Sequence, residues 1–261
     1  MILQGRGISP GEAEGEAVKL DERVSFLGDV DLERGKVFDE EKIADSIFVF
    51  PGGKGSTVGS YVIYQLKDNR TAPLGIINKR SETTVASGAI LSDIPLVDEI
   101  DIELIEPGDE VRIDGDSGEV ELKGVELQPV VTAFLKRDDR ILLLKRSEKV
   151  GSYEGKWAGV SGYLERSDPA EHARMEIREE TGLDAVCVSK GEPVRVRYEG
   201  KKKIWEVNPF LFEVKKEPEL NWESTEYRWV RPEGIKDMET VPKLWQAYLS
   251  ARCEDESEEG R

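Results

Sequence analysis

The 261-residue chain contains little histidine and little cysteine, with one His and two Cys. The two cysteines, Cys187 and Cys253, lie far apart and lack the spacing of a metal-ligand motif. They favour a reducing, cytoplasmic setting. No apolar run approaches the roughly 20 residues that a membrane helix needs. The first residues show no basic segment followed by an apolar one, so we expect no secretory signal.

Positive charge is also scarce, because 37 Lys and Arg stand against 54 Asp and Glu, for a net charge of −17. A chain this acidic repels nucleic acid and anionic membranes. We therefore expect neither a nucleic-acid polymer nor a membrane as a partner. The length and a hydrophobic content of 38% suit one large globular domain or two ordinary ones.

The pattern of apolar and polar residues changes near the middle of the chain. Residues 1–123 predict a mainly β domain. It has short β-like runs at 46–50, 74–78, 110–115 and 119–122 and one helix at 56–69, where Val58, Tyr61, Val62 and Leu66 keep helical spacing.

Residues 124–252 predict an α/β domain with its own apolar core. The pattern gives a hairpin at 129–147, a helix at 171–183, strands at 204–214 and 226–230, and a last helix from Val241. We place the domain boundary at 123–128. Residues 253–261 read as an acidic disordered tail.

One glycine-rich stretch, "FPGGKGSTVGSYV" at 50–62, precedes the helix of the first half. Ser56 stands where an N-cap belongs, and glycines allow a close approach of backbone to a ligand. The free N–H groups of a helix start suit a phosphate or carboxylate, and Lys54 could add a charge. The spacing alone leaves open a plain capped helix. It is not a P-loop, because GxxxxGK[ST] is absent.

Further motifs support a resemblance over residues 5–122. "GRGISPGEAEGEAV", "SFLGDVDLERG", "FPGGKGSTVGSYV", "SETTVASGAILSDIPLVD" and "GDEVRIDGDSGEVEL" together resemble the small subunit of archaeal phosphomevalonate dehydratase, the aconitase X swivel domain. The resemblance implies a swivelling β/α domain, a flattened β barrel with flanking helices. It implies a large partner subunit that carries an iron–sulfur cluster, which the cysteines of this chain cannot hold.

The same resemblance implies a reaction and a site. The pair dehydrates (R)-5-phosphomevalonate to trans-anhydromevalonate 5-phosphate in the archaeal mevalonate pathway. The proton-accepting serine of the family falls on Ser56, with Lys54 and Gly55 beside it as substrate-binding residues. Ser60 is the alternative.

The helix at 171–183 carries Glu176, Glu179 and Glu180 at i, i+3 and i+4, so three acids share one face. "SGYLERSDPAEHARMEIREETGL" resembles the signature of Nudix hydrolases, GX5EX7REUXEEXGU. The resemblance implies an α/β/α sandwich whose glutamates hold Mg²⁺ or Mn²⁺ against a diphosphate.

The motif departs from the family pattern in two places. Met175 replaces the arginine that orients the glutamates, and the segment from Gly162 to Gly182 is one residue short. The loop glutamate of the family has no clean counterpart near Glu165, Ser167 and Asp168. Without the arginine, mutual repulsion should weaken metal binding. A Nudix-fold domain kept only for binding or assembly stays open as an alternative.

Other candidates in the second half also stay open. His172 is a base or a half-buried helix residue, and Glu223 or Glu226 is a distal base or a rim charge. Trp205, Trp222 and Trp229 are core residues or line a nucleobase or isoprenyl pocket. The fusion to a mevalonate-pathway domain points to isopentenyl diphosphate as one Nudix substrate.

The sequence thus predicts a dehydratase small subunit fused to a Nudix-type domain. Two rivals are a stand-alone Nudix pyrophosphatase with a regulatory first half and a non-enzymatic assembly protein. Capture of a cluster-bearing subunit, or metal-dependent release of phosphate, separates them.

Overall fold

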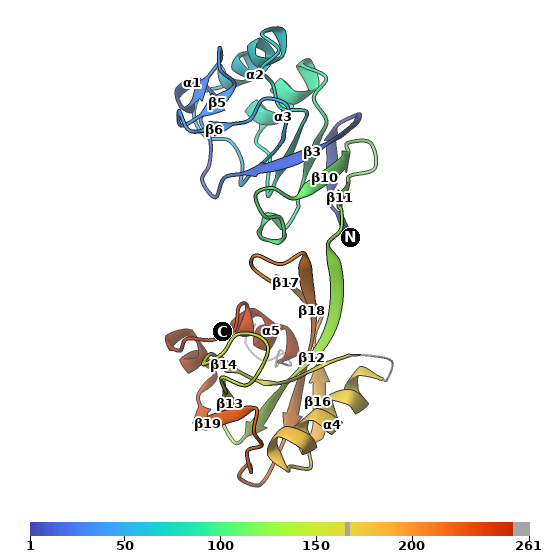
Figure 1. Cartoon of the computed structure of the whole chain (residues 1–261), viewed down its shortest axis with the longest axis vertical. Coiled ribbons are helices and arrows are strands. Elements are labelled where there is room, and N and C mark those ends of the chain that lie inside the picture. The colour runs from blue at the N-terminus through green and yellow to red at the C-terminus, as the bar shows by residue number, and fades with distance from the viewer. Residues whose placement is uncertain (165–167, 253–261) are drawn as a thin grey trace, which may run out of the picture. The chain divides into compact units, whose positions relative to one another are not determined.

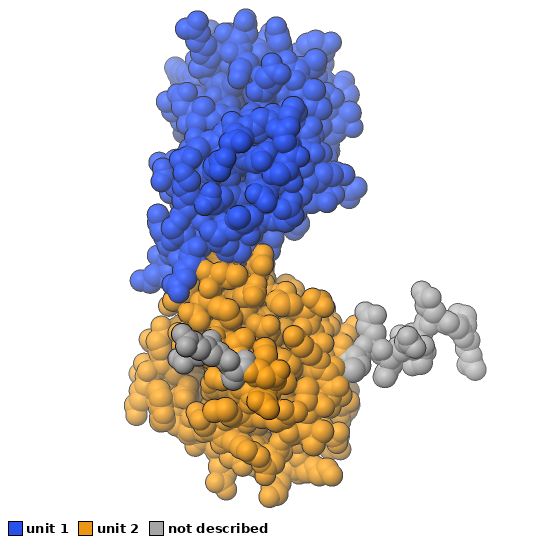
Figure 2. All heavy atoms as spheres, turned by 90° about the vertical axis from the view of Figure 1, so that its right-hand side faces the viewer, with its two compact units in different colours: residues 1–126, 199–202 blue, residues 127–198, 203–261 orange. Residues whose placement is uncertain are grey.

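The computed structural model describes residues 1–164 and 168–252. Its contacts divide the chain into two compact units (Figure 2). The first holds residues 1–126 and 199–202, and the second holds residues 127–198 and the chain from 203 onward. The domain limits 1–123 and 124–252 stay predictions, and the expected tail at 253–261 lies outside the described residues. No helix in the described part is long and apolar enough to cross a membrane.

The first unit alternates short strands with three helices (Figure 1). In chain order its elements are β1 (Ile2–Gln4), β2 (Arg6–Ser9), β3 (Glu12–Lys19), α1 (Phe26–Asp29), β4 (Val30–Asp31), β5 (Lys36–Val37), β6 (Glu41–Lys42), β7 (Ile47–Phe50), α2 (Gly59–Asp68), β8 (Gly75–Asn78), α3 (Thr83–Leu91), β9 (Leu96–Asp98), the 3-10 turn η1 (Ile102–Leu104), β10 (Glu110–Asp114) and β11 (Glu119–Leu122).

Eight of these strands form one sheet in the order β1-β11-β10-β3-β7-β8-β9-β2. The four central strands β3, β7, β8 and β9 are parallel, and the outer pairs are antiparallel. Strands β7 and β8 are buried along their whole length, as expected for parallel strands covered on both faces. The carboxyl ends of β7, β8 and β9 therefore meet at one edge of the sheet.

Helix α2 begins later than the sequence predicted, at Gly59 rather than Ser56. Residues 56–59 form a separate turn, in which the Gly59 N–H donates to the Ser56 carbonyl at 3.0 Å. The buried side of α2 carries Val62, Ile63 and Leu66, which pack against α3 and β7. Val58 and Tyr61, which the spacing placed on the apolar face, are exposed, because the real face is rotated toward Ile63.

The second unit is built from antiparallel strands and two helices. Its elements are β12 (Glu126–Arg137), β13 (Arg140–Arg146), β14 (Trp157–Ala158), β15 (Val160–Tyr163), α4 (Pro169–Thr181), β16 (Val186–Lys190), β17 (Val194–Arg197), β18 (Lys203–Glu213), β19 (Ser224–Val230), the 3-10 turn η2 (Pro232–Asp237) and α5 (Leu244–Ala251).

The central strands run in the order β14-β13-β12-β18-β16, with β15 paired to β12, β17 to β18 and β19 to β13. The hairpin predicted at 129–147 is confirmed as β12 and β13, whose Arg137 and Arg140 face each other across a two-residue turn.

Side chains alternate between the two faces of this sheet. Ala133 and Leu142 join a core cluster with residues of α4, while Phe134 and Leu143 join a second cluster with residues of α5. The two helices thus lie on opposite faces of the sheet, with a core on each side (Figure 1).

Candidate functional sites

The glycine-rich segment of the first unit is a loop, residues 51–58, between β7 and α2. We refer to it as the glycine loop. It starts at the carboxyl end of a parallel strand, the edge where ligands bind in open α/β sheets. Gly52 and Gly55 have φ values of +151° and +94°, which only glycine adopts at low cost. A neighbouring extended segment holds the loop, since the Lys54 N–H donates to the Val24 carbonyl at 2.9 Å.

Ser56 and Ser60 differ in exposure and in hydrogen bonding. The exposed Ser56 hydroxyl accepts the Val58 N–H at 3.3 Å, and this is a turn contact before the helix. The predicted N-cap role of Ser56 is therefore wrong, because Val58 precedes the first helical residue and no side chain caps α2. Ser60 is only 9% exposed, and its hydroxyl donates to the Thr57 carbonyl at 2.9 Å.

The glycine loop offers positive groups to an anion. Within residues 1–164, which include this loop, no recorded hydrogen bond uses the N–H groups of Gly55, Ser56 or Thr57. The Lys54 ammonium lies 3.6 Å from Asp29 Oδ2 and is half exposed. Backbone donors beside a helix start and a half-exposed cation suit a phosphate, a carboxylate or a developing alkoxide.

A second polar network, which the sequence did not indicate, lies at the ends of β8 and β9. The buried Asp98 accepts two hydrogen bonds from the Arg6 guanidinium, at 3.0 and 2.9 Å, and one from the Ser81 N–H at 3.0 Å. The Ser81 hydroxyl donates to Asn78 Oδ1 at 2.9 Å. A polar residue as the last residue of each buried strand, Asn78 in β8 and Asp98 in β9, is the signal that could have revealed it. The network fixes the loop between β8 and α3, next to the glycine loop.

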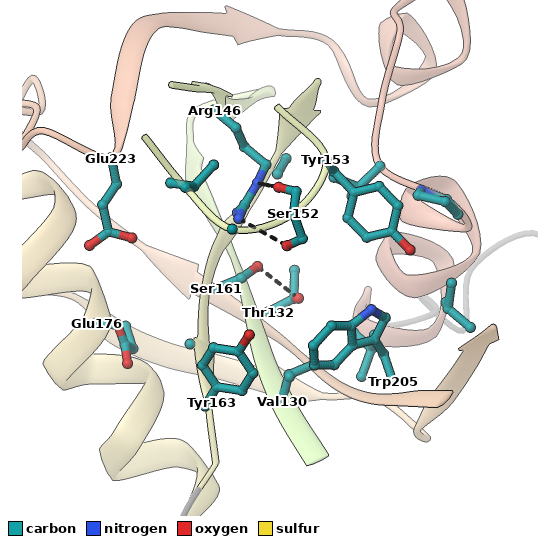
Figure 3. Close-up of a pocket in the computed structure, with 18 of the residues that line it drawn as sticks. Val130, Thr132, Arg146, Ser152, Tyr153, Ser161, Tyr163, Glu176, Trp205 and Glu223 are labelled. Atoms are coloured by element: carbon teal, nitrogen blue, oxygen red, sulfur yellow. Dashed lines mark hydrogen bonds between the residues drawn. The ribbon is translucent and has the colours of Figure 1, made fainter. Parts of the chain in front are cut away.

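The second unit contains a cavity of about 560 Å³ on its own surface (Figure 3). Figure 3 shows Glu176 and Glu223 on one side and Tyr153 and Trp205 on the other, with Arg146 near the top. Strands β12, β15, β17 and β18, helix α4 and the loop after β13 contribute lining residues. Acidic, basic and aromatic side chains therefore share one pocket.

Helix α4 supplies the carboxylates, and local signals set its limits. Asp168 caps it by accepting the N–H groups of Ala170 and Glu171 at 3.0 Å, and Pro169 occupies the first turn. The helix ends at Gly182, whose φ is +65°. Asp168 is thus engaged in capping, while Glu165 and Ser167 lie outside the described residues.

The three acids of α4 at i, i+3 and i+4 lie in different environments. Glu176 and Glu179 line the cavity. Glu180 is only 5% exposed and accepts the Ser161 N–H of β15 at 3.0 Å. His172 Nε2 lies 3.1 Å from Glu176 Oε1, so the single histidine pairs with an acid of the same helix face.

Burial and like charge raise two carboxyl pKa values here. Burial raises the pKa of Glu180 to about 8, and Glu223 and Glu176 add to the rise while the Ser161 N–H opposes it. Burial also raises the pKa of Glu176, and His172 opposes that rise while Glu179 and Glu223 add to it. The cluster therefore favours binding of a positive charge.

Glu223 and Glu226, which the sequence could not separate, are distinguished by their neighbours. Glu223 lines the cavity and acts electrostatically on Glu176 and Glu180. Glu226 is bound instead to Arg228, whose Nε and Nη2 lie 2.8 and 2.7 Å from its carboxylate.

The carboxylates of this cavity are of the right chemical type for a divalent ion, but their side chains do not converge on one point. Carboxylate oxygens are the ligands that Mg²⁺ and Mn²⁺ prefer. Across the described ranges 1–164 and 168–252, no three Asp, Glu, His or Cys side chains converge to hold an ion. Glu176, Glu179 and Glu223 could do so after side-chain rotation, with Glu180 turned from Ser161. Met175, at the position of the family arginine, is 53% exposed and supplies no positive charge to these glutamates.

The aromatic side of the cavity centres on Trp205, which is buried. Its ring centroid lies 5.6 Å from that of Tyr163 and 5.7 Å from that of Tyr198. Its indole N–H has no hydrogen-bond partner among the described residues. Trp222 also lines the cavity, whereas Trp229 donates to Glu217 at 2.8 Å outside it.

Comparison with known proteins matches each half separately. Residues 2–122 match the family model of the aconitase X swivel domain, and residues 126–250 match that of the NUDIX domain. A phosphomevalonate dehydratase small subunit from Thermococcus kodakarensis is 55% identical over 128 residues, which are 47% of this chain and 96% of that protein. One from Methanococcoides burtonii is 51% identical over 129 residues, 46% of this chain and 94% of that protein. The chain belongs to the family of phosphomevalonate dehydratase small subunits.

Solved structures again match one half at a time. The aconitase X of Thermococcus kodakaraensis in its holo-form is 53% identical over 47% of this chain and 98% of that one, with a TM-score of 0.46. A MutT protein from Methanosarcina mazei Go1 is 30% identical over 48% of this chain and 91% of that one, with a TM-score of 0.42.

The expected fold class is thereby confirmed: an N-terminal swivel domain precedes a C-terminal Nudix fold. Both sets of predicted site residues lie where chemistry is feasible. Lys54, Gly55 and Ser56 share the glycine loop, and Glu176 and Glu179 share the cavity wall. Glu180 differs, because its carboxyl faces inward. Their roles stay predictions.

Proposed function

We propose that the first domain is the small subunit of a phosphomevalonate dehydratase. With a large partner subunit it would convert (R)-5-phosphomevalonate to trans-anhydromevalonate 5-phosphate. The observation that carries the proposal is Ser56, an exposed hydroxyl in the glycine loop of a chain from this family. Ser56 would first give up its hydroxyl proton, and the resulting alkoxide would accept a proton from the substrate.

A serine is a weak base, because its alkoxide is strongly disfavoured in water. Three features of the loop support this role. The unused N–H groups of Gly55, Ser56 and Thr57 can stabilise negative charge, the Lys54 ammonium lies in the same loop, and the dipole of α2 begins just beyond. A partner that covers the loop would exclude water and strengthen all three effects.

An iron–sulfur cluster is implied for this reaction, but the chain does not fit one. Its two cysteines, Cys187 and Cys253, are too few for a cluster held by several thiolates. We assign the cluster to the partner and derive no step from it. The test is capture of a cluster-bearing large subunit by the tagged chain, followed by a dehydration assay of the purified pair.

We infer that the second domain hydrolyses a diphosphate with Mg²⁺ or Mn²⁺. Such an ion polarises a phosphoryl group and activates water. Glu176, Glu179 and Glu223 would hold the ion, and the pKa of Glu176, which burial raises and Glu179 and Glu223 help to raise, supports this role. Arg146, in the same cavity, would orient a phosphate.

A release assay tests this hydrolase. The full chain is incubated with Mg²⁺ or Mn²⁺ and with nucleoside diphosphate derivatives or prenyl diphosphates, and phosphate and monophosphate are measured. Release without dehydratase activity would favour the rival in which the chain is a Nudix pyrophosphatase with a regulatory first domain. No activity of either kind would favour an assembly protein.

A further inference from the structure

Two side chains outside the glycine loop hold one residue inside it from both sides. Glu82, directly before α3, accepts the Gly53 N–H at 2.5 Å. Arg23, in the segment before α1, donates from Nε and Nη2 to the Gly53 carbonyl at 3.0 and 2.5 Å. The Arg23 guanidinium and the Glu82 carboxylate also form an ion pair with each other. We call this arrangement the Arg23–Glu82 clamp.

Glu82 makes no capping contact with its own helix. It occupies the N-cap position of α3, where Ser, Thr, Asp or Asn would bind the first N–H groups, yet its side chain makes no cap hydrogen bond. Its carboxylate is directed to Gly53 instead. A longer acid at this position is thus explained by the glycine loop and not by α3.

The loop needs such a restraint because of its glycines. Peptide groups between glycines can turn over at little steric cost. A Cβ on Gly53 would lie 2.7 Å from Val85 Cγ2 and 3.3 Å from Glu82 Oε2, so the clamp closes only on glycine. Backbone bonds to Val24 hold the same two peptide groups, since the Val24 N–H donates to the Gly52 carbonyl at 3.2 Å and the Val24 carbonyl accepts the Lys54 N–H. The clamp binds the other polar atom of each group, the Gly53 N–H and the Gly53 carbonyl.

The backbone conformation at Gly53 determines the positions of the residues that follow it. Lys54 follows immediately, and its N–H is tied to Val24, the neighbour of Arg23. Ser56 comes two residues later, through Gly55 with its φ of +94°. The turn at 56–59 holds Ser56 from the other side, through the Gly59 N–H on its carbonyl and the Val58 N–H on its hydroxyl. The position of Ser56 therefore depends on Gly53 before it and on this turn after it.

We propose that the Arg23–Glu82 clamp positions the glycine loop, and with it Lys54 and Ser56, for proton transfer in the proposed dehydratase. The clamp does not touch the substrate. It keeps the loop in the one orientation that presents the Ser56 hydroxyl and the N–H groups around it. The inference rests on the proposed dehydratase function.

Two measurements test it, and only one depends on activity. In the full chain, the amide proton of ¹⁵N-labelled Gly53 should resonate far downfield and exchange slowly, because it donates to a carboxylate. Glu82→Ala should move that resonance upfield and speed its exchange. Glu82→Gln keeps an acceptor oxygen and should retain part of the protection. The remaining glycine amides report whether each variant is folded.

The second measurement is turnover with saturating large subunit. Glu82→Ala and Arg23→Ala should each lower kcat by about 10- to 100-fold with little change in KM, the range controlled by charge-assisted hydrogen bonds. The double variant should lose no more than the worse single one, because the pair acts as a unit. Glu82→Gln should restore part of kcat. The control is Glu110→Ala, an exposed acid on β10, which should leave kcat unchanged.

The outcomes separate the two proposals. Unchanged kcat in Glu82→Ala, or a Gly53 amide that ignores the substitution, would overturn the clamp. A clamp that served only subunit docking would raise the large-subunit concentration needed for half-maximal activity and leave kcat intact, which also overturns it. No turnover by the unchanged pair would overturn the dehydratase function, and with it the role of the clamp.

Discussion

Ser56 and Ser60 are four residues apart in the chain, but their hydroxyl groups make different hydrogen bonds. Ser60 donates to the Thr57 carbonyl from a buried position, so its hydroxyl stabilises the start of α2. The exposed Ser56 hydroxyl accepts a hydrogen bond from Val58, and within residues 1–164 and 168–252 no carbonyl or carboxylate accepts its proton. Of the two serines, Ser56 is therefore the one whose proton can leave and whose oxygen can face a substrate.

We expect Ser56→Ala to reduce dehydration by the two-subunit enzyme by about 1,000-fold or more, the loss typical of a group whose chemistry depends on a prepared electrostatic site. Assembly with the large subunit should be intact. Ser60→Ala should lower turnover mildly and reduce the free energy of unfolding by about 1 kcal/mol, because it deletes one buried hydrogen bond. Steady-state kinetics and denaturant melts check both. Near-normal turnover of Ser56→Ala would remove Ser56 from its role.

Glu180 gives the second domain a pH-dependent stability. Its folded-state pKa of about 8 lies above that of an unfolded carboxyl, so the folded state binds the proton more tightly. The contribution of Glu180 to the free energy of unfolding should therefore be full below the pKa of an unfolded carboxyl and be lost as pH rises through about 8, by up to ~1.4 kcal/mol per pH unit. Without divalent metal, we expect this contribution to fall by about 3 kcal/mol between pH 5 and pH 8.

Glu180→Gln should flatten that slope and stabilise the domain at pH 8, because the amide cannot ionise and still accepts the Ser161 N–H. Urea melts followed by tryptophan fluorescence report on this domain alone, since all five tryptophans lie between residues 157 and 245. The exposed Glu171→Gln on the same helix is the matched control. Equal slopes in Glu180→Gln and the unchanged chain would contradict the argument.

At the scale of elements, the sequence predicted a helix at 171–183, and α4 spans Pro169–Thr181. Its start was placed two residues late, because the cap by Asp168 was not recognised. Asp168, Pro169 and Gly182 set its ends, and the i, i+3, i+4 spacing placed three acids together. The sequence did not predict that these acids differ in burial and in hydrogen bonding. Glu180 is buried by the approach of β15, whose Ser161 N–H comes from another part of the chain. Glu223 enters the cluster by the same kind of long-range contact.

The first domain shows the same division. The buried strands at 47–50 and 75–78 were predicted from their apolar runs. The start of α2 was misplaced by three residues, because the turn at 56–59 has helix-like contacts that propensity cannot distinguish. The hold of Arg23 and Glu82 on Gly53 could not be predicted, since it joins segments 30 and 29 residues away in the chain.

We expect Mn²⁺ to stabilise the second domain, by about 2.7 kcal/mol at a concentration 100 times Kd. Glu179→Gln should remove most of that gain, because it deletes one exposed donor of the cluster. Met175→Arg should tighten binding and raise any hydrolysis, since an arginine at this exposed position reaches Glu179 at i+4. Melting temperatures with and without Mn²⁺ check the series, with Glu171→Gln as the control. No metal-dependent shift in any variant would leave the acids as surface charge.

At the scale of the whole molecule, the two units have separate sheets, separate cores and separate candidate sites. Lys54 and Ser56 belong to the first unit, and the cavity residues all belong to the second. A test can therefore contradict the proposed dehydratase or the proposed hydrolase without affecting the other proposal. A substitution on α4 should leave dehydration unchanged, and one in the glycine loop should leave metal binding unchanged.

The last prediction concerns what the chain can do alone. We expect the purified chain to show no dehydratase activity and no iron–sulfur absorbance, because the cluster and part of the site would come from the large subunit. Addition of a separately purified, cluster-bearing large subunit should restore dehydration, with activity saturating at equal amounts of the two chains. Cys187→Ser is the control, since Cys187 lies on β16 outside the glycine loop and should not change turnover of the pair. Cluster absorbance from the chain alone, or dehydration without a partner, would contradict the two-subunit enzyme. Either result would mean that this chain itself holds the groups that the reaction needs.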